Sequence, residues 1–134
     1  MNDFKCPKCH EHLRVGDQII FRVKNSTGQS ALLLLNPQIG NYSSIKHPSF
    51  RYTNGEPLDF YCPVCCSSLK SEIHPNLAHV LMEDESGKVF DVFFSQVAGE
   101  QSTFRTDGES VQQEGRDAGR YTYFKIGDKF KRFL

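Results

Sequence analysis

Four of the five cysteines in this chain of 134 residues lie in two copies of one short motif. Cys6 and Cys9 enclose the first Cys-Pro-X-Cys sequence, and Cys62 and Cys65 enclose the second, 56 positions later. Two such turns carry four thiols, which is the ligand set of one tetrahedral zinc ion with Zn–S distances of about 2.3 Å. The sequence therefore predicts one Zn2+ site formed by these four cysteines.

The predicted zinc ion has a structural role. Four thiolates complete its tetrahedral coordination and leave no position for a water molecule or a substrate. The proline after the first cysteine of each motif fixes the backbone φ angle and lacks an N–H group that the turn does not need. Zinc bound in this way contributes on the order of 10 kcal/mol to folding. The motif therefore predicts a metal-held platform and not a catalytic centre.

The repeat extends beyond the cysteines, because residues 4–13 and 60–69 share Phe, Cys, Pro, Cys and Leu at equal offsets. These segments resemble the knuckles of zinc-ribbon proteins, in which a Cys-Pro-X-Cys-Gly turn opens each of two hairpins. More loosely, they resemble a family of uncharacterised prokaryotic proteins that is named for paired Cys-Pro-X-Cys motifs. The resemblance implies a zinc-ribbon type of metal site and implies no activity.

The chain departs from the zinc-ribbon pattern in two respects. Zinc ribbons carry glycine directly after the second cysteine, whereas this chain has His10 and Cys66 there. Because histidine and cysteine adopt positive φ angles less readily than glycine, we expect an altered knuckle geometry. The 52 residues between Cys9 and Cys62 exceed a typical ribbon loop and predict an inserted hairpin or more.

Rubredoxin-like iron proteins also use two CxxC knuckles, which leaves electron transfer by bound iron as an alternative.

Cys66 and His10 are the remaining candidates for chemistry beside the predicted metal. We interpret Cys66 as a spare thiol, with a group that orients the ligands, an alternative ligand or a redox-sensitive thiol as alternatives. His10 and His12 form a His-X-His pair, and a second metal site that also uses His74 and His79 is a weaker alternative. A nucleophilic pair of Cys66 and His74 is another. The chain contains no Gly-rich phosphate loop, HExxH or GxSxG sequence.

The net charge and its distribution along the chain bear on the classes of partner. Sixteen Lys and Arg balance sixteen Asp and Glu, so the net charge is zero and gives no general attraction to nucleic acid. Residues 1–57 carry seven cationic and four anionic side chains, residues 58–115 carry three and ten, and residues 116–134 carry six and two. The ends are therefore basic and the middle is acidic.

The start of the chain and its apolar runs bear on the compartment. The longest obvious apolar run, 31–35, is far shorter than the ~20 residues that span a bilayer. The chain reaches Cys6 directly after Met1-Asn2-Asp3-Phe4-Lys5, which leaves no room for a signal peptide. We therefore expect a cytoplasmic protein without a membrane segment, in which the thiols stay reduced and bind metal.

The C-terminal tail combines cations with aromatic rings. In proteins that bind single-stranded nucleic acid, aromatic rings stack on bases and cations hold phosphates. The predicted nucleic-acid contacts are Arg120, Tyr121, Tyr123, Lys125, Lys129, Lys131 and Arg132. A final strand whose residues alternately face the core and the solvent explains the same pattern equally well.

Apolar and β-branched runs separated by turns predict a mostly β fold. The runs lie at 15–23, 31–35, 77–82, 89–94, 102–106 and 121–126, and the first two are expected to form a hairpin. Helical periodicity is weak throughout. We expect a zinc-ribbon-type knuckle pair with an inserted hairpin, packed on or continued by an antiparallel β-sheet.

The predicted organisation divides the chain near its middle. Residues 1–75 form a zinc-ribbon-type region with a long insertion between the knuckles, in which 40–52 is polar and irregular. Residues 76–134 form an antiparallel β extension with a mobile loop at 107–119 and a basic tail, and we favour one domain over two. The polarity and the three glycines of 107–119 carry the prediction of a loop.

These features predict a non-enzymatic zinc-binding module that presents a β surface to a macromolecular partner, with nucleic acid or nucleoprotein favoured. A protein–protein regulatory adaptor is the first alternative, because the net charge is zero and the middle of the chain is acidic. A thiol-based redox sensor or enzyme that uses Cys66 is the second alternative. No feature of the sequence indicates a small-molecule substrate.

Overall fold

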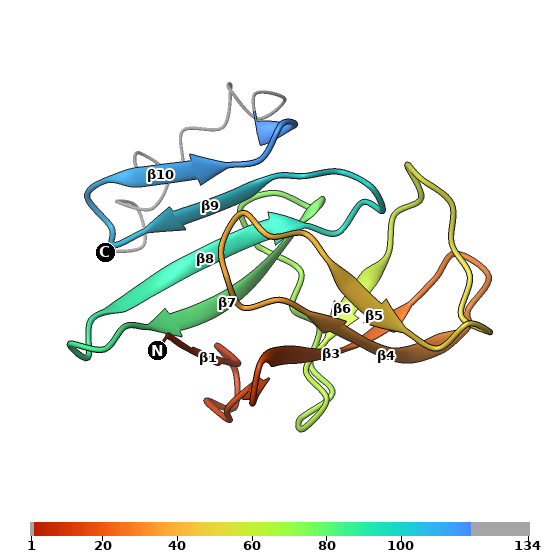
Figure 1. Cartoon of the computed structure of the whole chain (residues 1–134), viewed down its shortest axis with the longest axis horizontal. Helices are drawn as coiled ribbons and strands as arrows, with labels where there is room; N and C mark the ends of the chain where they lie inside the picture. Colours follow the sequence, from red (N-terminus) through yellow and green to blue (C-terminus); the bar gives the residue numbers. More distant parts are fainter. Residues whose placement is uncertain (1, 119–134) are drawn as a thin grey trace.

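The computed structural model describes residues 2–118 as two five-stranded antiparallel sheets (Figure 1). Sheet A has the strand order β1-β7-β8-β9-β10, whereas sheet B has the order β2-β3-β4-β5 with β6 paired to β3. Sheet A contains β1 (Asp3–Lys5), β7 (Leu77–Glu83), β8 (Val89–Ser95), β9 (Thr103–Thr106) and β10 (Val111–Glu114). Sheet B contains β2 (Arg14–Val15), β3 (Gln18–Lys24), β4 (Ser30–Leu35), β5 (Ser44–Lys46) and β6 (Asp59–Tyr61). The predicted mostly β, antiparallel fold is confirmed.

The hydrophobic core lies between the inner faces of the two sheets. Successive residues of a strand point to opposite faces, so every second side chain can be buried. In β3, Ile19, Phe21 and Val23 are buried, while the residues between them are exposed or half-buried. Val80 and Met82 of β7 belong to the same core cluster. Full burial of side chains of this size contributes about 1.5–3 kcal/mol each, so this core holds the sheets face to face.

The chain exchanges sheets near the predicted metal ligands. It starts in sheet A with β1, runs through sheet B from β2 to β6, and returns to sheet A at β7 (Figure 1). Phe4 of β1 lies opposite Met82 of β7. The predicted first region, 1–75, therefore supplies one strand to the sheet formed by the second, 76–134. The division of the chain at residue 75 stays a prediction.

Five of the six predicted strands are present, with ends shifted by a few residues. The hairpin expected from the first two runs is formed by β3 and β4, which pair over six residues. The run at 15–23 is divided between β2 and β3. The sixth predicted strand, 121–126, lies outside the described residues.

Two strands lie where irregular structure was expected. β5 lies within 40–52, and β10 lies within the loop predicted at 107–119, where it pairs with β9. Both are short edge strands with mostly exposed side chains, so no alternation of apolar and polar residues reveals them in the sequence. The expectation of irregular structure is wrong for these seven residues.

The described part of the chain contains no helix that is long and apolar enough to cross a membrane.

Candidate metal centre

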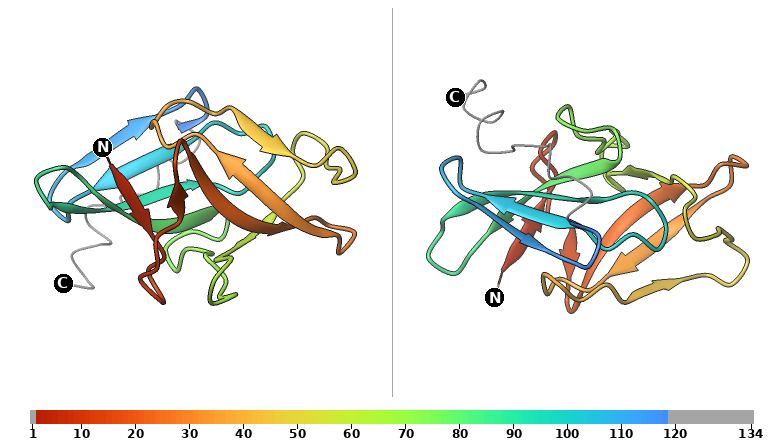
Figure 2. Two further views of the ribbon diagram at one scale, coloured as in Figure 1. Left: turned by 60° about the horizontal axis from the view of Figure 1, so that its bottom comes forward. Right: turned by 90° about the horizontal axis from the view of Figure 1, so that it is seen from above.

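The four cysteines of the two motifs meet where the loop after β1 and the loop after β6 lie side by side (Figure 2). Their Sγ atoms all lie within 4.8 Å of one another. The separation is 3.8 Å between Cys6 Sγ and Cys65 Sγ, and 3.7 Å between Cys9 Sγ and Cys62 Sγ. The structure thus brings together all four predicted ligands.

The spacing of the sulfur atoms fits a single zinc ion. In a tetrahedron with Zn–S distances of about 2.3 Å, each S–S edge is about 3.8 Å long. Two of the six separations, 3.7 and 3.8 Å, match such edges, and the other four are no longer than 4.8 Å. All five cysteines are free thiols, as a thiolate-bound metal requires. Because the four sulfurs could supply every corner of the tetrahedron, a metal ion held by them would have no position left for a substrate.

The two knuckles have the same backbone hydrogen bonds, displaced by 56 positions. In the first knuckle, Cys6 N donates to Glu11 O at 3.0 Å and His10 N donates to Cys6 O at 2.9 Å. The same two bonds recur in the second knuckle, where each is 3.0 Å long. The repeated sequence therefore folds in the same way twice.

Backbone N–H groups point at the first sulfur of each knuckle. Lys8 N donates to Cys6 Sγ at 3.3 Å, and Val64 N donates to Cys62 Sγ at 3.4 Å. Cys65 N also donates to Cys62 Sγ, at 3.5 Å. Such bonds favour the charged form of the sulfur, which is the form that binds metal. The turn thus orients the first sulfur of each knuckle and reduces the cost of charging it.

The residues that replace the expected glycines keep the glycine conformation. His10 and Cys66 both have a φ angle of 63°, and they are the non-glycine residues with positive φ in the described part of the chain. The expectation of an altered knuckle geometry is therefore wrong. The surrounding hydrogen bonds hold both residues in the left-handed region, which costs a residue with a Cβ atom roughly 1–2 kcal/mol.

The surroundings of the four thiols differ although the backbone repeats. Cys6 and Cys62 are fully buried, Cys9 is half-buried and Cys65 is exposed. Burial raises the pKa of the Cys6 thiol to about 12. Hydrogen bonds from the side chain and the backbone N–H of Ser67 lower the pKa of Cys65 to about 6. Sequence reasoning missed Ser67, whose only signal is its position two residues after the last ligand.

The knuckles connect the two sheets in opposite directions. The first leaves β1 of sheet A and leads to β2 of sheet B. The second leaves β6 of sheet B and leads back toward sheet A, where Lys70 forms an isolated bridge with Ala78 of β7. A metal ion held by both knuckles therefore ties sheet A to sheet B at the two points where the chain changes sheets.

The other candidate residues do not join the sulfur cluster. Cys66 and His10 are exposed beside it, and neither belongs to the group of four. His12 Nδ1 lies 2.5 Å from Asp3 Oδ2. Within residues 2–118 the cysteine cluster is the group that could hold a metal, and the alternative histidine site is not formed there. The predicted nucleic-acid contacts at 120–132 lie outside the described residues.

Comparison of the chain with models of protein families, with curated proteins and with solved structures gives no match. The resemblance to zinc ribbons therefore depends on the two knuckles alone. The pairing of Cys66 with His74 and the redox role of Cys66 stay predictions.

Proposed function

We propose that this chain is a non-enzymatic module in which one structural zinc ion holds together two β-sheets that bind a macromolecular partner. The observation that carries the proposal is the match between the sulfur separations of 3.7 and 3.8 Å and the edges of a zinc tetrathiolate. Bound zinc would supply the positive charge that holds four thiolates together. The knuckles of the zinc-ribbon type would then fix sheet A against sheet B.

Elemental analysis of the purified full chain tests the metal. We expect about one zinc ion per chain in the wild type and almost none in Cys62→Ser, because a buried ligand is lost. The variant should also lose its folded state, since metal binding and folding are coupled. Cys66→Ser is the matched control, because it removes the neighbouring thiol, which lies outside the cluster. A wild type without zinc, or a Cys62→Ser variant that keeps zinc and fold, would contradict the proposal.

A nucleic acid is the first class of partner, and the sequence supports it. The basic aromatic tail, 120–132, carries five cations and four aromatic rings. Binding would require these side chains to neutralise phosphates and stack on bases, so the affinity should fall steeply as salt increases. Titration of the zinc-loaded chain with single-stranded and double-stranded DNA and RNA at low salt tests this. Absence of binding to all of them would exclude this partner.

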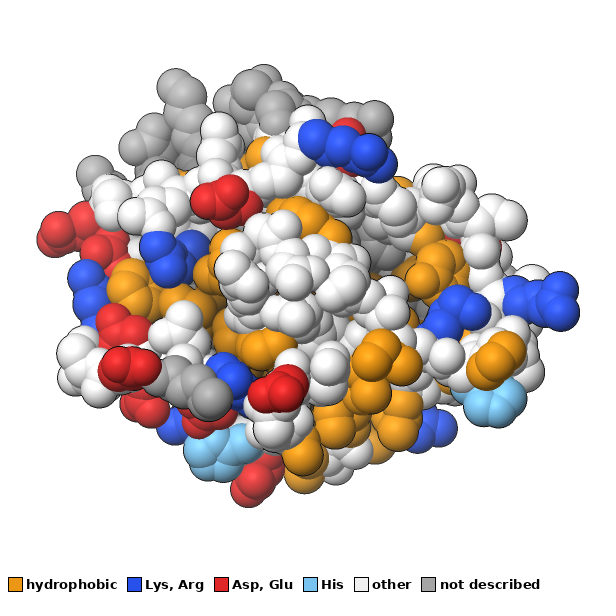
Figure 3. Space-filling view, viewed as in Figure 1, with side chains coloured by type: hydrophobic (Ala, Val, Ile, Leu, Met, Phe, Trp, Pro, Cys, Tyr) orange, Lys and Arg blue, Asp and Glu red, His pale blue; other side chains and the backbone are white. Residues whose placement is uncertain are grey.

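A protein is the second class of partner, and one surface of sheet B favours it. Ile20, Leu34 and Ile45 lie opposite one another on three neighbouring strands. They point outward, because Ile19 beside them in β3 points into the core. Hydrophobic side chains gather over sheet B in the lower half of Figure 3. Ile45 is 56% exposed and Leu32 of the next row is 52% exposed, which is typical of a protein contact surface.

Substitution on this outer apolar row separates the two classes of partner. Ile45→Lys should abolish co-purification of a reproducible protein partner and leave any nucleic-acid binding unchanged. Val89→Lys is the matched control, because Val89 of sheet A is 51% exposed and lies outside the row. Equal loss in both variants, or loss in neither, would contradict a protein partner on sheet B.

A thiol-based sensor or enzyme remains the third proposal. Cys66 is exposed, and a sensor thiol must be accessible. If Cys66 is such a thiol, it should alkylate quickly at neutral pH in the zinc-loaded chain while the four ligands stay protected. Slow alkylation of all five cysteines, measured by mass spectrometry, would exclude the role.

A further inference from the structure

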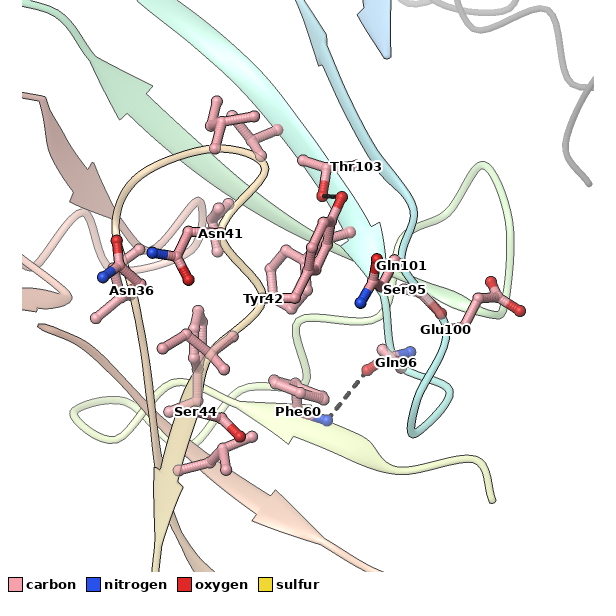
Figure 4. A pocket seen from close by; sticks show the side chains of 18 of the residues that line it. Asn36, Asn41, Tyr42, Ser44, Phe60, Ser95, Gln96, Glu100, Gln101 and Thr103 are labelled. Carbon is pink, nitrogen blue, oxygen red and sulfur yellow. Dashed lines mark hydrogen bonds between the residues drawn. The ribbon is translucent and has the colours of Figure 1, made fainter. Parts of the chain in front are cut away.

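A cavity of about 210 Å3 lies between the two sheets, beneath the loops that leave β4 and β8 (Figure 4). Protein interiors are packed to the density of organic crystals and contain few voids larger than a water molecule. An apolar cavity of about 150 Å3 is already large enough to bind benzene. The cavity in this chain is therefore large enough for a small organic molecule.

The inner wall of the cavity is aromatic. Phe21 of β3, Phe60 of β6 and Phe94 of β8 all line it. Their ring centroids lie 5.3–5.4 Å apart, with Phe60 edge-on to both neighbours. Gln96 supports this wall, because its Oε1 accepts a hydrogen bond from Phe60 N at 3.1 Å and its Nε2 donates to Pro75 O at 3.3 Å. Aromatic edges and faces of this kind favour an aromatic ligand.

The rim of the cavity carries neutral hydrogen-bonding groups from both sheets. Asn41 and Tyr42 come from the loop before β5, whereas Gln101 comes from the loop before β9 (Figure 4). The Tyr42 hydroxyl lies 2.9 Å from Thr103 Oγ1 and donates to Glu114 O at 3.1 Å, so it connects the loop to sheet A. A ligand with an apolar body in the cavity could place one polar group among these side chains.

The charge of the lining restricts the ligand further. Among the described residues that line the cavity there is no Lys, Arg or His, and Glu100 is the one charged side chain. An anionic ligand would lose its hydration without gaining a cationic partner. We propose that the cavity between the sheets is a binding site for a small, neutral aromatic molecule of about the size of indole, with its polar group at the rim near Tyr42.

Titration of the zinc-loaded full chain with indole tests this site. We expect saturable shifts in the backbone amide NMR signals of residues that line the cavity, such as Phe60, Phe94 and Gln101. Indole-3-carboxylate has the same ring system with a negative charge, and we expect it to bind at least about tenfold more weakly because no cation lines the site. Absence of saturable shifts with indole, or equal binding of the two compounds, would overturn the proposal.

A substitution that fills the cavity locates the binding. Ala98 lines the cavity and is 7% exposed, so Ala98→Leu adds three carbon atoms to its wall. Ala31→Leu is the control, because Ala31 packs against the core but does not line the cavity. We expect at least about tenfold weaker indole binding in Ala98→Leu and unchanged binding in Ala31→Leu. Unchanged affinity in a folded Ala98→Leu variant would overturn the proposal, and the comparison of the two compounds in the wild type does not depend on either variant.

Discussion

The knuckle at Cys6 and Cys9 and the knuckle at Cys62 and Cys65 have matching backbones in different surroundings. Each has the same two backbone hydrogen bonds and one residue with a φ angle of 63° after its second cysteine. The last ligand of the first knuckle is half-buried, whereas the last ligand of the second is exposed. A ten-residue segment therefore determines where the sulfurs point, while the rest of the fold determines how accessible each sulfur is.

Replacement of a buried cysteine in each knuckle tests whether the two knuckles contribute equally to metal binding and folding. Cys6 and Cys62 occupy equivalent positions and are both fully buried. Cys6→Ser and Cys62→Ser should therefore both abolish zinc binding and folding, a loss on the order of 10 kcal/mol of metal-binding free energy. Zinc content and urea unfolding of both variants measure this. If only one variant loses zinc, the knuckles are not equivalent.

A second pair of variants uses the difference in accessibility. Three cysteines and one histidine form a common structural zinc site. Cys65→His should keep about one zinc ion per chain, because the exposed position has room for an imidazole. Cys6→His should lose the metal, because the larger side chain does not fit a fully buried position. Zinc content and metal competition with a chelator distinguish the two, and equal zinc retention would contradict the role of burial.

A third test concerns the two residues with positive φ. His10→Gly and Cys66→Gly should each raise the free energy of unfolding of the zinc-loaded chain by about 0.5–1 kcal/mol, because glycine adopts this conformation without a Cβ clash. Urea unfolding measures the change. Cys66→Ala is the control, since it removes the thiol but keeps the Cβ atom, and it should not stabilise. Equal stability of the glycine and alanine variants would show that the backbone conformation is not the cause.

The two knuckles also differ in the side-chain pairs beside them. Asp3 pairs with His12 in the first knuckle, while the equivalent Asp59 pairs with Lys70 at 3.8 Å in the second. His12 and both members of the second pair are largely exposed, so His12→Ala and Lys70→Ala should each change the free energy of unfolding by less than about 1 kcal/mol. A larger loss in either variant, measured by urea unfolding, would show that one knuckle depends on its side-chain pair.

The sequence predicted the strands that are recognisable from a short segment alone. The central strands β3, β4, β7 and β8 are apolar runs bounded by turns, so their existence could be read from the chain. The edge strands β5 and β10 have mostly exposed side chains and form only because a neighbouring strand offers a hydrogen-bonding edge. Their pairing is a property of the sheet and could not be read from the short segments themselves.

The sequence alone predicted the cluster of four cysteines that could hold a metal ion, because two equal motifs supply the four thiols of one tetrahedral site. It did not determine that His10 and Cys66 would keep the glycine conformation, because the hydrogen bonds of each knuckle outweigh the local cost of positive φ. Only the tertiary structure placed β1 in sheet A beside β7, which makes the two knuckles cross between the sheets. The aromatic cavity between those sheets likewise depends on the tertiary structure. Its size and shape result from the way in which distant side chains such as Phe21 and Phe94 pack together.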